Sequence, residues 1–375
     1  MGFHEFSSPY DWSRIAAYKR TAKAAFGGMI DLSVGSPVDP VPDSVRKALA
    51  VAANDPNAYG YPATAGTADL RAAIAEWFSA TRNVDLQAIH ADVVPTVGSK
   101  EGVALMASLL HFGEDDVVVQ PKVSYPTYEI GTQLAGAQVL KVDDVADVAS
   151  WRNVPGVKAV WVNSPCNPTG EVYSAERMAG IVAAAREIGA VVLSDECYAL
   201  MQWRGATNSA DDDPLQSTPC ALRSDVCAGS AEGVLVLYSL SKQSNMAGYR
   251  TAFIAGDESL IASMSAYRKQ IGQIIPGPAQ AAMAAGLRDL ESVKVQHARY
   301  RERLGVLVSA LRAYGYCTDM PDGALYVWVR AKSGDCWTDM EQLAKIGIIA
   351  SPGEFYGAPE CLRFSATASD EAIAS

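Results

Sequence analysis

The amino-acid sequence predicts an α/β protein, in which a mainly parallel sheet is covered by helices and a smaller α+β unit is attached. Two observations support this fold class. Between residues 92 and 255, short continuous apolar runs alternate with stretches of helical periodicity, a pattern typical of parallel strands buried on both faces. After Gly277-Pro278 the pattern changes to two long helices followed by two further strands.

The strands of the predicted sheet are short apolar runs. We expect them at Asp92 to Val97, Val117 to Gln120, Val157 to Val162, Val191 to Leu193, Val234 to Leu237 and Ala252 to Ala255. Helices are expected at Lys100 to Phe112, after the turn Gly98-Ser99, and at Ala175 to Ile188. Ser174 can cap the second helix, and Gly189 suits its C-terminal stop.

The C-terminal part of the chain predicts a second domain. Ala279 to Leu290 and Ser292 to Ala313 have the periodicity of long helices, and Leu325 to Val329 and Leu362 to Phe364 are expected strands. A chain of 375 residues is too long for one simple core, so two domains are expected. We expect residues 41–275 to form a large α/β domain, and residues 1–40 with 276–375 to form the small α+β domain.

The composition argues against several classes of function. The net charge is −11 and no block of lysines and arginines occurs, which disfavours nucleic acid or an anionic membrane as a partner. No apolar run is long enough to span a bilayer, and the first residues lack the basic-then-apolar order of a secretory signal. We therefore expect a cytoplasmic protein that acts on small molecules and binds neither nucleic acid nor a membrane.

No metal site is expected. The seven cysteines are scattered without a C-x-x-C motif, as reduced thiols of a cytosolic protein would be, and the four histidines lie far apart. The acidic triplet Asp211-Asp212-Asp213 falls in a polar stretch from Gly205 to Glu232, which we expect to be a solvated surface excursion. The common dinucleotide, nucleotide and zinc-protease motifs are absent.

The most informative motif surrounds Lys242. The apolar run Val234 to Leu237 leads into Tyr238-Ser239-Leu240-Ser241-Lys242, and Arg250 follows eight residues after the lysine. One amine, two hydroxyls and one guanidinium are thereby expected around one point. The amine can form a Schiff base, while the hydroxyls and the guanidinium can hold a phosphate. This combination suits pyridoxal 5'-phosphate (PLP), an anionic cofactor that carries an aldehyde.

Further polar residues follow other predicted strands, at the edge where open α/β sheets bind their ligands. Ser99 opens a helix whose free N–H groups can cradle a phosphate. Asn167 lies in the rigid turn Asn163 to Gly170, where it can cap the turn or direct its amide at a ring oxygen. Asp195 ends a buried strand, where its carboxylate needs either a protein cation or a protonated pyridine nitrogen. Tyr198 can donate to a phenolate oxygen beside it.

Arg363 stands within another apolar run, Leu362-Arg363-Phe364. An arginine in this pattern either pairs with a protein carboxylate or receives the carboxylate of a substrate. The fork of N–H groups suits bidentate capture of such a group. The residues alone leave both alternatives open.

Together these motifs resemble the fold-type I, PLP-dependent aminotransferases of the aspartate aminotransferase superfamily. The matching segments follow the family's order across nearly the whole chain: Leu32 to Pro37, Tyr61 to Gly66, Gly98 to Lys100, Tyr125 to Tyr128, Asn163 to Gly170, Asp195 to Tyr198, Ser239 to Arg250 and Arg363 to Ser365. The resemblance implies the fold of that superfamily, with a seven-stranded, mainly parallel sheet. It also implies a homodimer with shared active sites.

The resemblance implies catalytic roles for Lys242, Asp195 and Tyr198. Lys242 would form the internal aldimine and move the proton between the substrate Cα and the C4' carbon of the cofactor. Asp195 would keep the pyridine nitrogen protonated, so that the ring accepts electrons. Asn167 and Tyr198 would bond the phenolic oxygen, and Tyr125 would stack on the ring.

The resemblance also implies which residues bind the phosphate and the substrate. The phosphate would be held by the backbone at Ser99 and Lys100, the hydroxyls of Ser239 and Ser241, and the guanidinium of Arg250. Tyr61 would reach the phosphate bound by the neighbouring subunit. Arg363 would bind the substrate α-carboxylate with the help of Gly35, and Asn167 would lie beside the substrate.

A narrower resemblance is to the actinobacterial succinyldiaminopimelate transaminases of lysine biosynthesis. It is carried by Leu32 to Pro40, Gly60 to Thr67, Ser239 to Arg250 and Ser351 to Gly357. It implies exchange of an amino group between N-succinyl-LL-2,6-diaminopimelate and 2-oxoglutarate or glutamate. Three alternatives stay open: aminotransfer from aspartate, an aromatic amino acid or free diaminopimelate; PLP-dependent lyase chemistry; and a ligand sensor without turnover.

The proposed substrate carries carboxylates beyond its α-carboxylate, so the distal pocket needs cations or N–H donors. Arg268, Lys269 and Gln273 follow the predicted cofactor strands and are candidates, although they also fit a solvated helix face. The N-terminal segment Tyr10 to Arg14 can close over the site.

Overall fold

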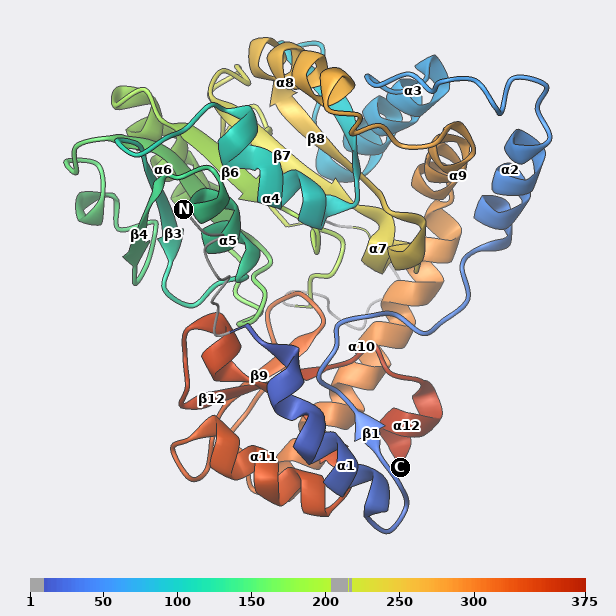
Figure 1. Ribbon diagram of the computed structural model, residues 1–375, viewed down its shortest axis with the longest axis vertical. Helices are drawn as coiled ribbons and strands as arrows, with labels where there is room; N and C mark the ends of the chain where they lie inside the picture. The colour runs from blue at the N-terminus through green and yellow to red at the C-terminus, as the bar shows by residue number, and fades with distance from the viewer. Residues whose placement is uncertain (1–9, 204–214, 216–217) are drawn as a thin grey trace, which may run out of the picture.

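The computed structural model describes residues 10–203, 215 and 218–375, which form a larger and a smaller unit (Figure 1). The larger unit holds the main sheet. The smaller unit combines the beginning and the end of the chain, drawn in blue and red at the bottom of Figure 1. The acidic triplet Asp211-Asp212-Asp213 lies outside the described residues.

The main sheet has the strand order β2-β8-β7-β6-β5-β3-β4. Its strands are β2 (Ala91–Val97), β3 (Val117–Pro121), β4 (Gln138–Val142), β5 (Val157–Asn163), β6 (Val191–Asp195), β7 (Val234–Ser239) and β8 (Thr251–Asp257). In this sheet β8 runs antiparallel to both of its neighbours, and every other pair is parallel. The predicted mainly parallel, seven-stranded sheet is confirmed.

Six of these strands lie where the sequence predicted them, and β4 is the one that was not recognised. It forms the edge of the sheet and pairs with β3 alone. Of its residues only Val142 is buried, and Gln138 and Lys141 are exposed. An edge strand of this kind has no continuous apolar run, so its pattern carries little signal.

Helices cover both faces of the sheet, as predicted. On one face α4 (Ser99–Leu109), α5 (Thr127–Leu134) and α8 (Glu258–Gln270) enclose a core that includes Met106, Tyr128 and Met264. The other face is covered by α2 (Asp43–Ala53), α3 (Ala68–Trp77), α6 (Ala175–Glu187) and α9 (Gly277–Arg288). Ser174 caps α6 as predicted, because its hydroxyl accepts a hydrogen bond from the Arg177 N–H at 3.2 Å.

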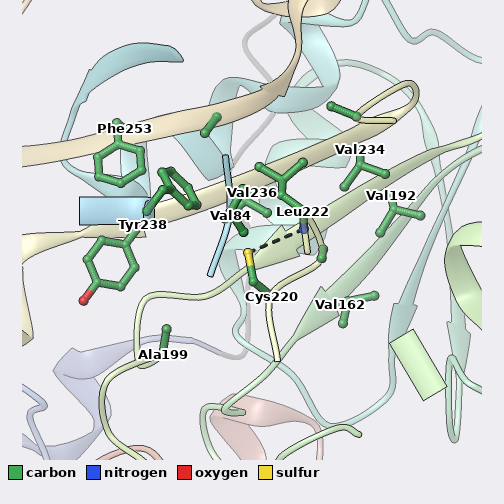
Figure 2. Close-up of a cluster of buried hydrophobic side chains, with 14 of the residues drawn as sticks. Val84, Val162, Val192, Ala199, Cys220, Leu222, Val234, Val236, Tyr238 and Phe253 are labelled. Carbon is green, nitrogen blue, oxygen red and sulfur yellow. Dashed lines mark hydrogen bonds between the residues drawn. The ribbon is translucent and has the colours of Figure 1, made fainter. Parts of the chain in front are cut away.

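Figure 2 shows part of the core on this second face, where Val162 of β5, Val192 of β6 and Val236 of β7 pack close to Cys220 and Leu222. The segment from Thr218 to Leu222 belongs to the polar stretch that the sequence predicted as a surface excursion. For this segment the prediction is wrong, because four of its five residues are buried. Backbone bonds tie it to buried charges: the Ala221 N–H donates to Glu196 at 2.8 Å, and Arg82 donates to the Thr218 carbonyl at 2.8 Å.

The smaller unit contains two short sheets. β1 (Ile30–Asp31) pairs in parallel with β10 (Ile348–Ile349), and an antiparallel sheet has the order β11 (Ser351–Pro352), β12 (Cys361–Ser365), β9 (Tyr326–Arg330). Its helices are α1 (Ala16–Ala24), α11 (Cys336–Lys345), α12 (Asp370–Ala374) and most of α10 (Leu290–Ala313). The β1–β10 pair joins a segment near the start of the chain to one near its end.

The two hydrophobic cores divide within α10, which runs from one unit to the other (Figure 1). Val293, near the start of the helix, packs in the larger core, whereas Tyr300 and Leu304 pack in the smaller one. Leu287 of α9 also belongs to the larger core. That core therefore extends beyond residue 275, where the sequence placed the boundary.

Short helical turns complete the described chain: η1 (Trp12–Ile15), η2 (Phe78–Arg82), η3 (Val148–Ser150), α7 (Leu240–Gln243), η4 (Ala247–Tyr249) and η5 (Gly353–Tyr356). Among the described residues, no helix combines the length and the apolarity that a membrane crossing needs.

Candidate active site

A cavity of about 400 Å³ collects almost all of the predicted site residues. They are Gly35, Ser99, Lys100, Tyr125, Asn167, Asp195, Tyr198, Ser239, Ser241, Lys242, Arg250 and Arg363. The strand directions explain the gathering: β2, β5, β6 and β7 all end at this edge of the sheet, and the antiparallel β8 begins there. Tyr61 is the exception among the predicted residues, because it is fully exposed and does not line the cavity.

Lys242 lies in α7, the single helical turn that follows β7. Its ammonium group donates a hydrogen bond to the backbone carbonyl of Gly35, which comes from the smaller unit. Within the described part of the chain, no carboxylate forms an ion pair with this lysine. The amine is thus held in the cavity by a neutral acceptor, which a reaction partner can replace.

A cradle for an anion lies at the start of α4. Gly98 precedes this helix with φ +77°, and a Cβ atom added to it would overlap the guanidinium of Arg250. Arg250 is held in place by donation to the Ala247 carbonyl at 2.7 Å. The hydroxyls of Ser239 and Ser241 lie 2.7 Å apart in the wall of the same cavity. Helix N–H groups, a guanidinium and two hydroxyls together suit a phosphate group.

Asp195 is a buried carboxylate that has no ion pair with any residue that the structure describes. Its Oδ2 accepts a hydrogen bond from the Tyr128 hydroxyl at 2.8 Å, and its Oδ1 accepts one from the Cys197 N–H at 3.1 Å. Burial raises the pKa of Asp195, and the hydrogen bonds from Tyr128 and Cys197 oppose this shift only in part. A carboxylate in these surroundings is stabilised by a ligand that brings a protonated nitrogen.

The turn after β5 contains two asparagines with different positions. Asn163 braces the turn: its Nδ2 donates to the Asp195 carbonyl at 2.9 Å, and its Oδ1 accepts from the Asn167 N–H at 2.8 Å. The side chain of Asn167 lines the cavity, and its Oδ1 accepts a hydrogen bond from Arg363 at 2.7 Å. The braced turn therefore fixes one amide in the cavity.

Arg363 lies on β12 and is only 4% exposed. Its guanidinium donates to Asn167 and, at 2.8 Å, to the Ser33 carbonyl, and it lies 4.0 Å from the ring centre of Tyr326 and 4.7 Å from that of Tyr356. Its Nε finds no hydrogen-bond partner among the residues that the structure describes. In the described residues no carboxylate pairs with Arg363, so the alternative of a protein ion pair is excluded there. A buried guanidinium with an unused N–H group is suited to an incoming carboxylate.

Two tyrosines near the cavity were not singled out by the sequence. Tyr326 of β9 has its hydroxyl 2.6 Å from that of Tyr198, and Tyr128 of α5 donates to Asp195. Burial raises the pKa of Tyr198 and of Tyr128 well above the usual range, so both remain protonated donors. Tyr128 follows Tyr125 by three residues, a helical spacing that could have identified it, whereas Tyr326 stands in an apolar strand without any such signal.

The N-terminal segment lies at the cavity, in agreement with the sequence prediction. Tyr10 and Trp12 line the cavity, and Arg14 forms an ion pair with Glu354 at 2.6 Å. The ammonium of Lys100 lies 5.5 Å from the ring centre of Tyr10, so its side chain points toward this segment.

The predicted distal residues do not reach the cavity of their own chain. Arg268 is fully buried, with an ion pair to Glu101 at 2.8 Å and a hydrogen bond to the Gln273 carbonyl at 3.2 Å. Lys269 is exposed, and neither it nor Gln273 lines the cavity. The prediction fails for this cavity because α8 packs Arg268 against α4, on an outer face of the sheet.

Comparisons with known proteins agree with this geometry. The family described as aminotransferase class I and II matches residues 27–374. The chain is 39% identical to a 4-dedimethylamino-4-oxo-anhydrotetracycline transaminase, OxyQ, of Streptomyces rimosus, over 98% of this chain and 97% of that protein. It is 29% identical to an LL-diaminopimelate aminotransferase of Syntrophobacter fumaroxidans, over 94% and 89%. A solved structure, the probable N-succinyldiaminopimelate aminotransferase from Thermus thermophilus, superposes with a TM-score of 0.84 at 26% identity, over 98% and 97%.

A cavity that offers an amine, a cation-seeking carboxylate and a phosphate cradle suits a cofactor with an aldehyde, a basic ring nitrogen and a phosphate. The enzymes of the matching family use such a cofactor, and the cofactor of this protein is PLP. The chain belongs to the class I and II aminotransferases and has their fold-type I architecture. The resemblance seen in the sequence motifs is confirmed at this level.

Proposed function

We propose that the protein exchanges an amino group between N-succinyl-LL-2,6-diaminopimelate and 2-oxoglutarate or glutamate, a step in the synthesis of diaminopimelate and lysine. The observation that carries this proposal is a pair of cavity-lining cations, Arg363 and Lys100, beside the Arg250 that we assign to the phosphate. In the described chain neither is ion-paired with a carboxylate. A substrate with carboxylates at both ends matches two such cations. The named activity of the Thermus thermophilus relative supports the same substrate class.

The residues around Lys242 supply the proton transfers of this reaction. Bound PLP provides an electron sink conjugated to the substrate Cα. We assign Lys242 as the base: once it has left the Gly35 carbonyl and lost its extra proton, its neutral amine would take the proton from the substrate Cα and pass it to the C4' carbon. Asp195 would hold the ring N–H and thereby gain the positive partner that its buried site lacks. Tyr198 and Asn167 would donate to the phenolic oxygen.

The remaining cavity residues bind and orient. We assign the cofactor phosphate to the N–H groups of Ser99 and Lys100, the hydroxyls of Ser239 and Ser241, and Arg250. Tyr125 lines the cavity and would stack on the cofactor ring. Arg363 would bind the α-carboxylate beside Gly35, where a Cβ atom would overlap the Tyr326 hydroxyl.

We further propose a homodimer in which Tyr61 reaches the phosphate site of the partner subunit. Tyr59 and Tyr61 lie between α2 and α3, and both are almost fully exposed, at 91% and 102%. Two neighbouring tyrosines in water are the kind of surface that a second copy covers. The predicted cytoplasmic location, and the expected lack of nucleic-acid and membrane partners, continue to rest on the sequence.

The substrate proposal is tested by titrating single amino donors into the PLP-loaded enzyme and following the absorption band of the cofactor. N-succinyl-LL-diaminopimelate and glutamate should bleach the band, and aspartate and phenylalanine should leave it almost unchanged. Lys100→Met should raise the KM for the succinylated donor by about tenfold, the worth of one ion contact in a closed site. Lys269→Met removes an exposed lysine outside the cavity and should change nothing. Bleaching by aspartate or phenylalanine instead would contradict the proposed substrate but would still agree with aminotransferase activity.

A second candidate acceptor follows from the 39% identity with OxyQ, which spans 98% of the chain. A polycyclic ketone of the oxo-anhydrotetracycline type would then receive the amino group. Conversion of such a ketone by the glutamate-treated enzyme, with little turnover of the succinylated acceptor, would favour this function over the first.

A further inference from the structure

Tyr326 is a cavity residue to which neither the motifs nor the assignments above give a role. It lies on β9 of the smaller unit, is 2% exposed, and lines the cavity. Its hydroxyl is 2.6 Å from the hydroxyl of Tyr198, which follows β6 in the larger unit. The two rings meet edge to face, with centres 5.6 Å apart. One hydrogen bond thus joins the two units directly inside the cavity.

The ring of Tyr326 has a second partner. In the antiparallel pair β12–β9, Arg363 lies opposite Trp328, so Tyr326 is its diagonal neighbour on the same face. The guanidinium of Arg363 lies 4.0 Å from the ring centre of Tyr326. This buried contact orients a charge that has no carboxylate partner in the described chain.

The hydroxyl of Tyr326 also packs directly against the backbone of Gly35. A Cβ atom added at Gly35 would overlap this hydroxyl, so the contact leaves no room for a side chain. The carbonyl of the same glycine accepts the ammonium of Lys242. Tyr326 is therefore in contact with the hydroxyl of Tyr198, the guanidinium of Arg363 and the backbone of Gly35.

We propose that Tyr326 is a positioning residue. Its hydroxyl directs the proton of Tyr198 toward the cofactor, and its ring holds the guanidinium of Arg363 in the orientation that binds the substrate carboxylate. The proposal rests on the roles assigned above to Tyr198 and Arg363. The Tyr198 oxygen has one proton to donate. If that proton points to the phenolic oxygen of PLP, Tyr198 must accept the hydrogen bond from Tyr326. The two hydrogen bonds then polarise one another in a dry site, and Tyr198 becomes a stronger donor.

The hydroxyl is tested with the PLP-loaded Tyr326→Phe variant, by titrating the absorption band of the bound cofactor against pH. Loss of the second hydrogen bond weakens the donation from Tyr198 to the ionised phenolic oxygen. The spectral pKa should therefore rise by roughly one unit, the worth of one buried hydrogen bond. The KM for the amino donor should stay within about twofold, because the ring that supports Arg363 remains.

The ring is tested with Tyr326→Leu, which should add a rise in the KM for the amino donor of roughly tenfold to the spectral shift, because the cation–ring contact is lost. Tyr316→Phe is a matched control: Tyr316 is also buried in the smaller unit, and its hydroxyl donates to Asp339 at 2.7 Å, but it does not line the cavity. Tyr316→Phe should move neither quantity.

A double-mutant cycle separates this proposal from the function on which it rests. Tyr198→Phe should raise the spectral pKa by itself, and adding Tyr326→Phe should then produce almost no further shift, since the two hydroxyls act in series. A Tyr326→Phe enzyme with the wild-type spectral pKa, or equal shifts in Tyr316→Phe, would overturn the proposal. A silent Tyr198→Phe would overturn the role of Tyr198 itself.

Discussion

Asp195 and Glu196 are neighbours in sequence and both are buried, yet their surroundings are opposite. Glu196 accepts hydrogen bonds from the guanidinium of Arg82, the hydroxyl of Ser194 at 3.0 Å and the N–H of Ala221 at 2.8 Å. Asp195 faces the cavity, and it accepts hydrogen bonds from neutral groups, the Tyr128 hydroxyl and the Cys197 N–H. The fold itself supplies a cation to Glu196, whereas we propose that the cofactor supplies one to Asp195.

The buried arginines repeat this difference. Arg268 is paired with Glu101, whereas the hydrogen bonds of Arg363 within the described residues go to neutral partners, the Asn167 amide and the Ser33 carbonyl. Burial therefore does not distinguish a functional charge from a structural one. The distinction lies in whether the chain itself supplies the opposite charge.

The largest effect on catalysis is expected from Asp195→Asn. This change should lower kcat/KM on the order of 10³ to 10⁴-fold, because the ring nitrogen loses its negative partner. Steady-state kinetics with the best amino donor measures the loss. A fall of less than tenfold would place Asp195 with the structural carboxylates.

The same variant should be more stable than the wild type when PLP is absent. The pKa of Asp195 is raised in the folded state, so the wild type loses stability as the pH rises from the ordinary aspartate range through that raised pKa. The asparagine side chain of the variant does not titrate. Urea denaturation of the PLP-free proteins should therefore show a gap that opens with rising pH, and equal stability at every pH would contradict the assigned surroundings.

Arg82→Met tests the structural side of the comparison. It leaves Glu196 buried without its cation and should destabilise the protein by about 3–5 kcal/mol, as removal of one partner of a buried pair does. The kcat of the folded enzyme should remain close to that of the wild type. The double variant Arg82→Met/Glu196→Gln should regain much of the free energy of unfolding in chemical denaturation. If it does not, the loss in Arg82→Met comes from packing and not from the unpaired charge of Glu196.

Arg363→Lys should raise the KM for the amino donor by about 10- to 100-fold, because an ammonium cannot make the bidentate contact of a guanidinium. Arg268→Lys is the matched change at the paired arginine. It should lower stability moderately and leave the KM unchanged. Equal rises of the KM in the two variants would contradict the distinction between Arg363 as a substrate-binding arginine and Arg268 as a structural one.

The smallest effect is expected at Gly98. Gly98→Ala places a Cβ atom against Arg250 and should weaken PLP binding by roughly tenfold, measured as the dissociation constant of the cofactor. Gly189→Ala is the control, since Gly189 also has positive φ, at +69°, but open space around it. Both variants carry the cost of a left-handed backbone, and Gly98→Ala alone should affect the cofactor.

Much of the fold was predictable because buried parallel strands have continuous apolar sequences, as in Val234 to Leu237. The edge strand β4 was missed, and so were helices such as α5 and α8, whose apolar faces are narrow. The cavity residues at the strand ends were predictable for a related reason, since the direction of a parallel sheet brings Asp195 and Lys242 to one edge.

The sequence by itself determined the order of the buried strands, the motif around Lys242 and the family resemblance, because these depend on local patterns and on short spacings. Only the tertiary structure decided which charges find partners. Arg268 meets Glu101 across 167 positions of sequence, and Arg363 meets Asn167 across 196. Tyr326 reaches Tyr198 across 128 positions. Such pairings depend on how separate elements pack against one another. The periodicity of side chains within one element does not predict them.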